Sequence, residues 1–253
     1  MSVIRAVKTA YFSPSGGTKR AAELLCEQLG LPTEFVNCTC PPAALPASIP
    51  VEKDELLVVA FPVYGGFPPR VEGLFRQFRG QGGPCVLVAA YGNRDYENAL
   101  AAAAQQMTEQ GFVCVGGMAC ITPHVFAPDI GAGRPDAEDA PAFAAFAQKV
   151  LAACERSPLH PASLPGDANA HRKPLHPMGR SRDEQRCTRC GRCVRACPTG
   201  ALSDRLEVDG AKCVNCLVCS IGCPVGAWQF DTAASRAWLE QNFSARRAVE
   251  WFA

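Results

Sequence analysis

The sequence predicts an open, doubly wound α/β sheet of five parallel strands, followed by a second, smaller α+β domain. Two observations carry this fold class. Residues 1–155 alternate between apolar, strand-like runs and segments with helical periodicity, whereas residues 184–231 contain a cysteine pattern that occurs twice. The length of 253 residues leaves room for one medium domain and one small domain.

The expected strands and helices alternate through residues 1–155. Glu55–Val63 is nearly all apolar, as expected of a parallel strand that is buried on both faces. Pro69–Arg79 has apolar residues at helical spacing, and Tyr96–Gln110 is rich in alanine. The expected strands are Val3–Phe12, Thr33–Cys38, Glu55–Val63, Cys85–Tyr91 and Phe112–Ile121, and the expected helices are Thr18–Leu29, Pro69–Arg79, Tyr96–Gln110 and Ala140–Ala153.

The remaining residues divide into three parts. Residues 156–183 are rich in Pro, His and Arg without periodicity, which predicts an extended linker. Residues 184–231 form the small domain. Residues 232–253 are expected to form a C-terminal helix, near Ala233–Phe252, that folds back against one of the domains.

The cysteine pattern of the small domain indicates iron–sulfur chemistry. The run C-x₂-C-x₂-C-x₃-C-P begins at Cys187 and returns 26 residues later at Cys213, and the residues after each run repeat as well, which indicates an internal duplication. Eight thiolates at this spacing are the ligands of two [4Fe-4S] clusters, in which the fourth cysteine of each run binds the cluster of the other run. The expected ligand sets are Cys187, Cys190, Cys193 and Cys223 for one cluster, and Cys213, Cys216, Cys219 and Cys197 for the second.

Zinc and disulfides are the competing uses of these cysteines. Zinc sites commonly use two Cys-x₂-Cys pairs rather than three cysteines followed by Cys-Pro. Disulfides need an exported chain, and the first residues lack the basic start and apolar core of a signal peptide. No apolar stretch is long enough to span a membrane, so we expect a cytoplasmic protein without a membrane partner. The other cysteines are expected to be reduced packing residues: Cys26, Cys38, Cys40, Cys85, Cys114, Cys120 and Cys154.

A second site is expected at the carboxyl edge of the sheet, where the ligands of open α/β sheets bind. The first strand runs into Ser13-Pro-Ser-Gly-Gly-Thr18 and then a helix, which makes a phosphate cradle of hydroxyls, backbone N–H groups and the helix dipole. The same pattern also serves as an ordinary helix cap. Two further loops, Phe61–Gly66 and Tyr91–Tyr96, follow the third and fourth strands and should meet the first at this edge, although their tyrosines are also compatible with simple packing.

Together the three loops resemble the flavodoxin pattern, and the cysteine runs resemble bacterial-type two-cluster ferredoxins. The whole layout, including Ala132–Asp136, resembles a family of flavodoxin–ferredoxin fusions found mostly in anaerobes. The resemblance implies a flavodoxin-like domain that binds FMN. It places the phosphate at Ser13, Ser15, Gly16, Gly17 and Thr18, one side of the flavin ring at Pro62, Val63, Tyr64, Gly65 and Gly66, and the other side at Tyr91, Gly92, Asn93 and Tyr96.

The expected function is electron transfer, because FMN accepts two electrons and each cluster carries one. Two alternatives remain open: a flavin-dependent reductase with His124 and Arg134 lining a substrate cavity, and a flavin-free docking domain on a ferredoxin. Arg94 is expected either near the flavin or in solvent, and Trp228 either shields a cluster or packs in the core.

Charge separates the two halves of the chain. The chain carries a net charge of +1, but residues 1–155 carry −4 and residues 156–253 carry +5. Much of the positive excess lies between Arg172 and Arg195. These charges either offset the negative clusters or form a docking patch, near Arg189, Arg192 and Arg195, for an acidic redox partner protein. No recognition motif accompanies the charge, so nucleic acid is not an expected partner.

Overall fold

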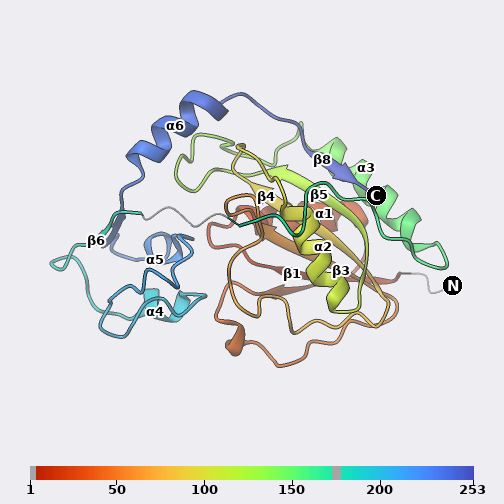
Figure 1. Ribbon diagram of the computed structural model, residues 1–253, viewed down its shortest axis with the longest axis horizontal. Helices are drawn as coiled ribbons and strands as arrows, with labels where there is room; N and C mark the ends of the chain where they lie inside the picture. The colour runs from red at the N-terminus through yellow and green to blue at the C-terminus, as the bar shows by residue number, and fades with distance from the viewer. Residues whose placement is uncertain (1–3, 173–177) are drawn as a thin grey trace.

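A computed structural model describes residues 4–172 and 178–253 and shows a six-stranded sheet beside a smaller module (Figure 1). The strand order is β2-β1-β3-β4-β5-β8, and the first five are parallel, which is the flavodoxin-like order. The predicted fold class is therefore confirmed. The strands are β1 (Ala6–Tyr11), β2 (Thr33–Asn37), β3 (Glu55–Pro62), β4 (Pro84–Tyr91), β5 (Val113–Ile121) and β8 (Glu250–Phe252).

Helices cover both faces of the sheet. One face packs against α1 (Gly17–Leu29) and α3 (Ala140–Cys154), and the other packs against α2 (Ala99–Glu109) and the loops that carry Ile49 and Phe78. The central strands β3 and β4 are buried along nearly their whole length, as predicted from their continuous apolar runs. The helix expected over Tyr96–Gln110 starts three residues late, because Tyr96 and the residues after it belong to the preceding loop.

The helix predicted over Pro69–Arg79 is wrong. These residues form a series of turns, in which Gly73 has a φ of 77° and Phe75 a φ of 64°. Two left-handed residues within three positions are incompatible with a right-handed helix. The apolar residues of the segment still reach the core, since Leu74, Phe75 and Phe78 are buried against the sheet.

The C-terminal prediction is also partly wrong. The helix expected over Ala233–Phe252 ends at Phe243 as α6 (Ala233–Phe243), and β8 then pairs antiparallel with the edge strand β5. Trp251 and Phe252, which looked helical in the periodicity, pack against the two cores of the sheet. The end of the chain therefore returns to the first domain and adds a sixth strand (Figure 1).

The small module lies beyond the carboxyl ends of the parallel strands (Figure 1). It contains the antiparallel pair β6 (Arg180–Arg182) and β7 (Trp228–Phe230), and one short helix in each cysteine run, α4 (Arg192–Ala196) and α5 (Val218–Ile221). A 3₁₀ turn, η1 (Pro42–Ala44), lies in the loop after β2. The domain limits 1–155, 156–183, 184–231 and 232–253 stay predictions, and residues 173–177 of the linker lie outside the described residues.

Candidate functional site

The loop between β1 and α1 has the features of a phosphate cradle. Gly16 adopts a left-handed conformation with φ 88° at the start of α1, and it has no side chain with which to cap the helix. Ser13 Oγ accepts a hydrogen bond from the Lys19 backbone N–H at 3.0 Å, which ties the loop to the first helical turn. The other N–H groups of this turn and the helix dipole favour an anion. Ser15 and Gly16 are exposed, whereas Thr18 is buried.

Two threonines that the sequence reasoning missed shape this loop. Thr39 Oγ1 accepts a hydrogen bond from the Ser13 N–H at 2.7 Å. A Cβ atom on Gly17 would lie 2.9 Å from Thr122 Cβ, so this close approach requires glycine. Thr39 and Thr122 follow the carboxyl ends of β2 and β5, and that position is the signal by which the sequence could have revealed them.

The second predicted loop contacts the third. Tyr64 and Phe67 exchange backbone hydrogen bonds around a tight turn, in which Gly65 and Gly66 have φ values of 58° and 81°. A side chain on Gly66 would overlap the side chain of Glu97, and the Gly66 carbonyl accepts a hydrogen bond from the backbone N–H of the residue that follows Glu97. The structure therefore brings Pro62–Gly66 and Tyr91–Tyr96 together at one edge, as the sequence predicted.

The third loop contains buried polar atoms. Among the described residues, Tyr91 Oη and Asn93 Oδ1 are buried and have no hydrogen-bond partner. A buried polar atom without a partner is costly, and both side chains here lie against the C-terminal end of the chain, where Arg247 packs on the Tyr91 ring. Gly92 contacts the His124 ring so closely that a Cβ atom would overlap it. The part of the site that fits FMN is therefore the phosphate cradle at Ser13–Thr18.

The C-terminal arm, which we define as residues 244–252, covers this third loop. Asn93 Nδ2 donates hydrogen bonds to the Phe243 carbonyl at 2.6 Å and to the first alanine carbonyl of the arm at 2.7 Å. Arg247 donates to the Arg94 carbonyl at 2.5 Å and lies 5.7 Å from the centre of the Tyr91 ring. Tyr96 Oη donates to Glu250 at 2.8 Å. The sequence contains no signal for this cover, because it depends on the path of α6.

His124 and Arg134, the two candidate cavity-lining residues, lie in different surroundings. Burial lowers the pKa of His124 to about 4, with a further contribution from Arg94, so the ring is neutral near pH 7. Its Nδ1 accepts the Phe126 backbone N–H at 3.1 Å, which leaves the proton on Nε2. Arg134 is 4% exposed, forms a bidentate ion pair with Asp139, and donates to a carbonyl of the C-terminal arm at 2.8 Å. It therefore does not line a cavity. Arg94 pairs with Glu97 of its own loop.

The first predicted cysteine set surrounds one small cavity. The cavity has a volume of about 20 Å³, and its lining includes all four predicted ligands, Cys187, Cys190, Cys193 and Cys223, together with Trp228. Hydrogen bonds from the Arg192 N–H and the Thr188 hydroxyl lower the pKa of Cys190. Partial burial opposes ionisation of Cys223, but four backbone N–H groups outweigh it and lower the pKa of that thiol. Such N–H donors also tune the potential of a cluster.

The second predicted set is more deeply buried. Burial raises the pKa of Cys216 to about 12, and the nearby Cys219, Cys197 and Cys213 raise it further, so the four thiols of this set influence one another. Cys197 Sγ accepts the Ala201 N–H at 3.2 Å. Iron must therefore displace protons from buried thiols here. The described residues contain no group of three His, Cys, Asp or Glu placed to hold a single metal ion, whereas a [4Fe-4S] cluster spreads its thiolates around a cube.

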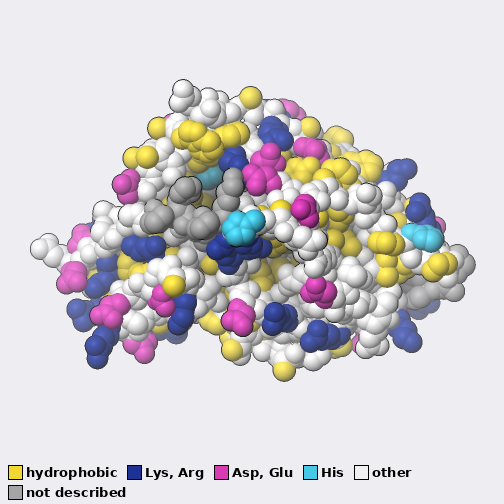
Figure 2. All heavy atoms as spheres, viewed as in Figure 1, with side chains coloured by type: hydrophobic (Ala, Val, Ile, Leu, Met, Phe, Trp, Pro, Cys, Tyr) yellow, Lys and Arg dark blue, Asp and Glu magenta, His cyan; other side chains and the backbone are white. Residues whose placement is uncertain are grey.

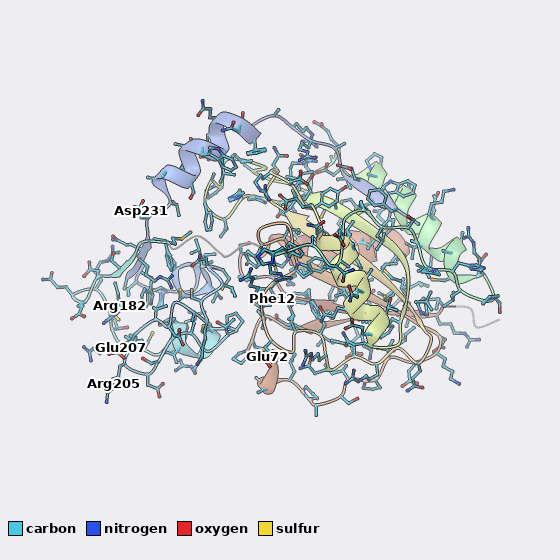
Figure 3. All side chains as sticks on the ribbon, viewed as in Figure 1. Phe12, Glu72, Arg182, Arg205, Glu207 and Asp231 are labelled. Carbon is cyan, nitrogen blue, oxygen red and sulfur yellow. The ribbon has the colours of Figure 1, made fainter. Side chains whose placement is uncertain are left out.

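The small module lies beside the carboxyl edge of the sheet. Figure 3 labels Phe12 at this edge and Arg182 on the module. Burial raises the pKa of Tyr64 well above its usual value, and the neighbouring Cys216 contributes to the rise. At the end of the first described part of the linker, Arg172 lies 4.7 Å from the centre of the Phe67 ring and donates to the Pro68 carbonyl at 2.9 Å.

Comparisons with known proteins match the two parts separately. Residues 181–203 match the 4Fe-4S binding domain family. Among solved structures, the chain is similar to a Streptococcus pneumoniae flavodoxin (16% identity, 58% of this chain and 98% of that chain, TM-score 0.41). It is also similar to a flavodoxin from the domain Archaea (15% identity, 60% and 99%, TM-score 0.40) and to an oxidoreductase from Corynebacterium diphtheriae (15% identity, 60% and 97%, TM-score 0.39).

No curated protein sequence matches the chain. The described helices include none that is long and apolar enough to cross a membrane. The chain thus combines a flavodoxin-like sheet, identified by its strand order, with a 4Fe-4S binding domain, identified by its sequence. The 4Fe-4S binding domain supports a role in electron transfer.

Proposed function

We propose that the protein is an electron-transfer iron–sulfur flavoprotein that passes single electrons between FMN and two [4Fe-4S] clusters. FMN exchanges electrons in pairs or singly, and each cluster exchanges them one at a time. The combination would let FMN, which exchanges two electrons, exchange them one at a time with the two clusters. Reduced thiols support a cytoplasmic location, because none of the fifteen cysteines is in a disulfide.

The position of the small module at the carboxyl edge of the sheet, with the loop Val214–Leu217 of its second cysteine run buried, carries the proposal (Figure 1). Tyr64 belongs to a loop that would flank the flavin ring, and Cys216 belongs to the second cysteine set. The loop that holds Cys216 is buried, and the small module to which it belongs lies beyond the carboxyl ends of the parallel strands (Figure 1). A flavin and a cluster bound at these positions would be neighbours, so that electrons would have a short path between them.

The residues of the chain hold and tune the cofactors. The Ser13–Thr18 loop would bind the phosphate through hydroxyls and N–H groups, and the loops around Tyr64 and Tyr91 would flank the ring. His124 keeps its proton on Nε2 beside Gly92 and stays neutral, so it brings no positive charge to the ring. The C-terminal arm packs on the 91–96 loop and holds it through hydrogen bonds to Asn93 and Arg94. Trp228 packs in the core of the small module with Cys197 and Leu202 and also lines the cavity of the first cysteine set.

An acidic redox protein is the proposed partner. Dark-blue Lys and Arg side chains gather over the small module, with some acidic ones among them (Figure 2). Arg189, Arg192 and Arg195 are exposed there, beside the first cysteine set. Complementary charge would speed the encounter with such a partner at low salt.

Anoxic purification of the full chain, with iron and FMN analysis, tests this function. We expect about eight irons and one FMN per chain, the content of two four-iron clusters and one flavin. An anaerobic redox titration would then give the order of the flavin and cluster potentials. Absence of FMN after reconstitution would refute the flavin part, and about four irons per chain would refute the second cluster.

A further inference from the structure

The two cysteine runs are duplicates, yet they are buried very differently. In the second run, Val214, Asn215, Cys216 and Leu217 are between 5% and 8% exposed. In the first run, the equivalent residues Thr188, Arg189 and Cys190 are exposed and Gly191 is partly exposed. Two copies of one motif have therefore been placed in different surroundings.

The difference in burial is matched by a difference in charge. Arg189, Arg192 and Arg195 of the first run are replaced at the equivalent positions of the second run by Asn215, Val218 and Ile221. Ile221 is 54% exposed, so this face of α5 remains in solvent although the loop before α5 is buried. The duplication has kept the ligands and changed the loop between them.

The two loops lie in different surroundings. The loop of the second run is buried, in a module that lies beyond the carboxyl ends of the parallel strands (Figure 1). Arg189 and Arg195 of the exposed loop line a surface pocket of about 100 Å³ with Arg205, Asp204 and Leu206. The backbone of this loop is braced, because Arg195 donates to the Cys190 carbonyl at 3.2 Å. This pocket is suited to a carboxylate group from a partner.

We infer that the clusters have a fixed order: the cluster of Cys213, Cys216, Cys219 and Cys197 is the inner one, next to the flavin loop, and the cluster of Cys187, Cys190, Cys193 and Cys223 is the outer one, at which an acidic one-electron protein docks. The inference rests on the proposed function and adds the order of the centres to it. The burial and the charge of the two loops support the same order independently.

The electron count is simple in this order. An electron from the reduced partner would reach the outer cluster first and leave the partner oxidised, and the inner cluster and the flavin would receive it in turn. The transfers between partner and clusters would involve electrons alone. Two such electrons, with a proton from water that forms an N–H bond on the ring, would reduce FMN by two electrons. The reverse direction uses the same path.

Paramagnetic access tests the order in the anoxically reconstituted, reduced full chain. Cys190→Ala removes a ligand of the outer cluster and Cys216→Ala a ligand of the inner one, so each variant should leave one cluster to observe. The probe is the anionic dysprosium–EDTA complex, which speeds the electron-spin relaxation of nearby clusters. We expect it to act several-fold more strongly on the cluster that remains in Cys216→Ala. Equal or reversed effects would overturn the inference.

A second measurement leaves all the ligands in place, in case a cysteine variant loses both clusters. The double variant R189Q/R192Q should be reduced by a chemically reduced acidic two-iron ferredoxin at least about threefold more slowly at low salt, with the difference lost at high salt. The control K212Q/R236Q removes two exposed charges elsewhere and should keep the rate of the unmodified protein. Equal rates for the two double variants would overturn the inference.

Failure of this inference can be distinguished from failure of the proposed function. Both measurements report on clusters and need no bound flavin. A chain that lacks FMN but shows the expected relaxation and rate differences would refute FMN binding. The assignment of the Cys187, Cys190, Cys193 and Cys223 cluster as the outer one would stand. A chain that contains FMN but shows equal relaxation would refute the order alone.

Discussion

The ion pair between Arg134 and Asp139 is expected to be among the most sensitive points of the first domain, and Arg134→Met tests it. Both side chains are 4% exposed. Removal of one partner from a buried pair costs about 3–5 kcal/mol, because the other charge stays buried without compensation. Asp139 keeps an Arg246 contact at 3.3 Å and the Asp136 N–H at 3.0 Å, so we expect the lower end, about 3 kcal/mol. That corresponds to a Tm lower by about 6–12 °C.

Urea unfolding under anoxic, reducing conditions, followed by far-UV circular dichroism, measures this loss. Arg236→Met is the control, because Arg236 and its partner Asp129 are 46% and 76% exposed and such pairs contribute at most about 1 kcal/mol. Arg134 also binds the Arg247 carbonyl, so hydrogen exchange should rise in residues 244–252 of Arg134→Met. A loss no larger than that of the control, with unchanged exchange, would refute the reasoning.

Three further changes separate the two cofactor sites and the buried histidine. Ser15→Ala should weaken FMN binding about tenfold, because a hydrogen bond to the charged phosphate is lost. The control Ser48→Ala should leave the affinity unchanged. Flavin fluorescence measures both affinities, and equal values would exclude Ser15 as a phosphate ligand. Cys197→Ala should lower the iron content and deplete the cluster of Cys213, Cys216 and Cys219; selective loss of the other cluster, seen by electron paramagnetic resonance, would contradict the crossed ligand sets. The pKa of His124 is about 4 in the folded chain against an ordinary 6.5, so the unfolded state takes up the proton first as the pH falls. The free energy of unfolding should therefore decrease between pH 6.5 and 4, and His124→Phe should reduce this slope whereas His171→Phe should not; equal slopes would show that His124 is not the group responsible.

Much of the fold could be predicted because local signals and tertiary structure agree. The continuous apolar runs of β3 and β4 admit few structures other than buried parallel strands, and Gly30 ends α1 in a left-handed conformation, with φ 66°. The segment around Leu74 and Phe78 misled the prediction, because turns that reach a core can reproduce helical spacing. The positive φ angles of Gly73 and Phe75 distinguish the observed turns from the predicted helix.

The candidate site could be predicted in its loops but not in its surroundings. Parallel strands end at one edge, so the convergence of Ser13, Tyr64 and Tyr91 follows from topology. The cover provided by Asn93 and Arg247 depends on where α6 delivers the end of the chain, which local sequence does not encode. The unequal burial of the two cysteine runs likewise required the placement of the module beside the sheet.

Rapid one-electron reduction of the anoxically loaded full chain tests the central claim most directly. A reductant is mixed in less than one equivalent, and the cluster and flavin absorbances are followed in time at several protein concentrations. Electron transfer within one chain is unimolecular. We therefore expect electrons to redistribute between clusters and flavin in a first-order phase whose rate constant does not depend on protein concentration. A redistribution rate proportional to protein concentration, or none at all, would contradict it.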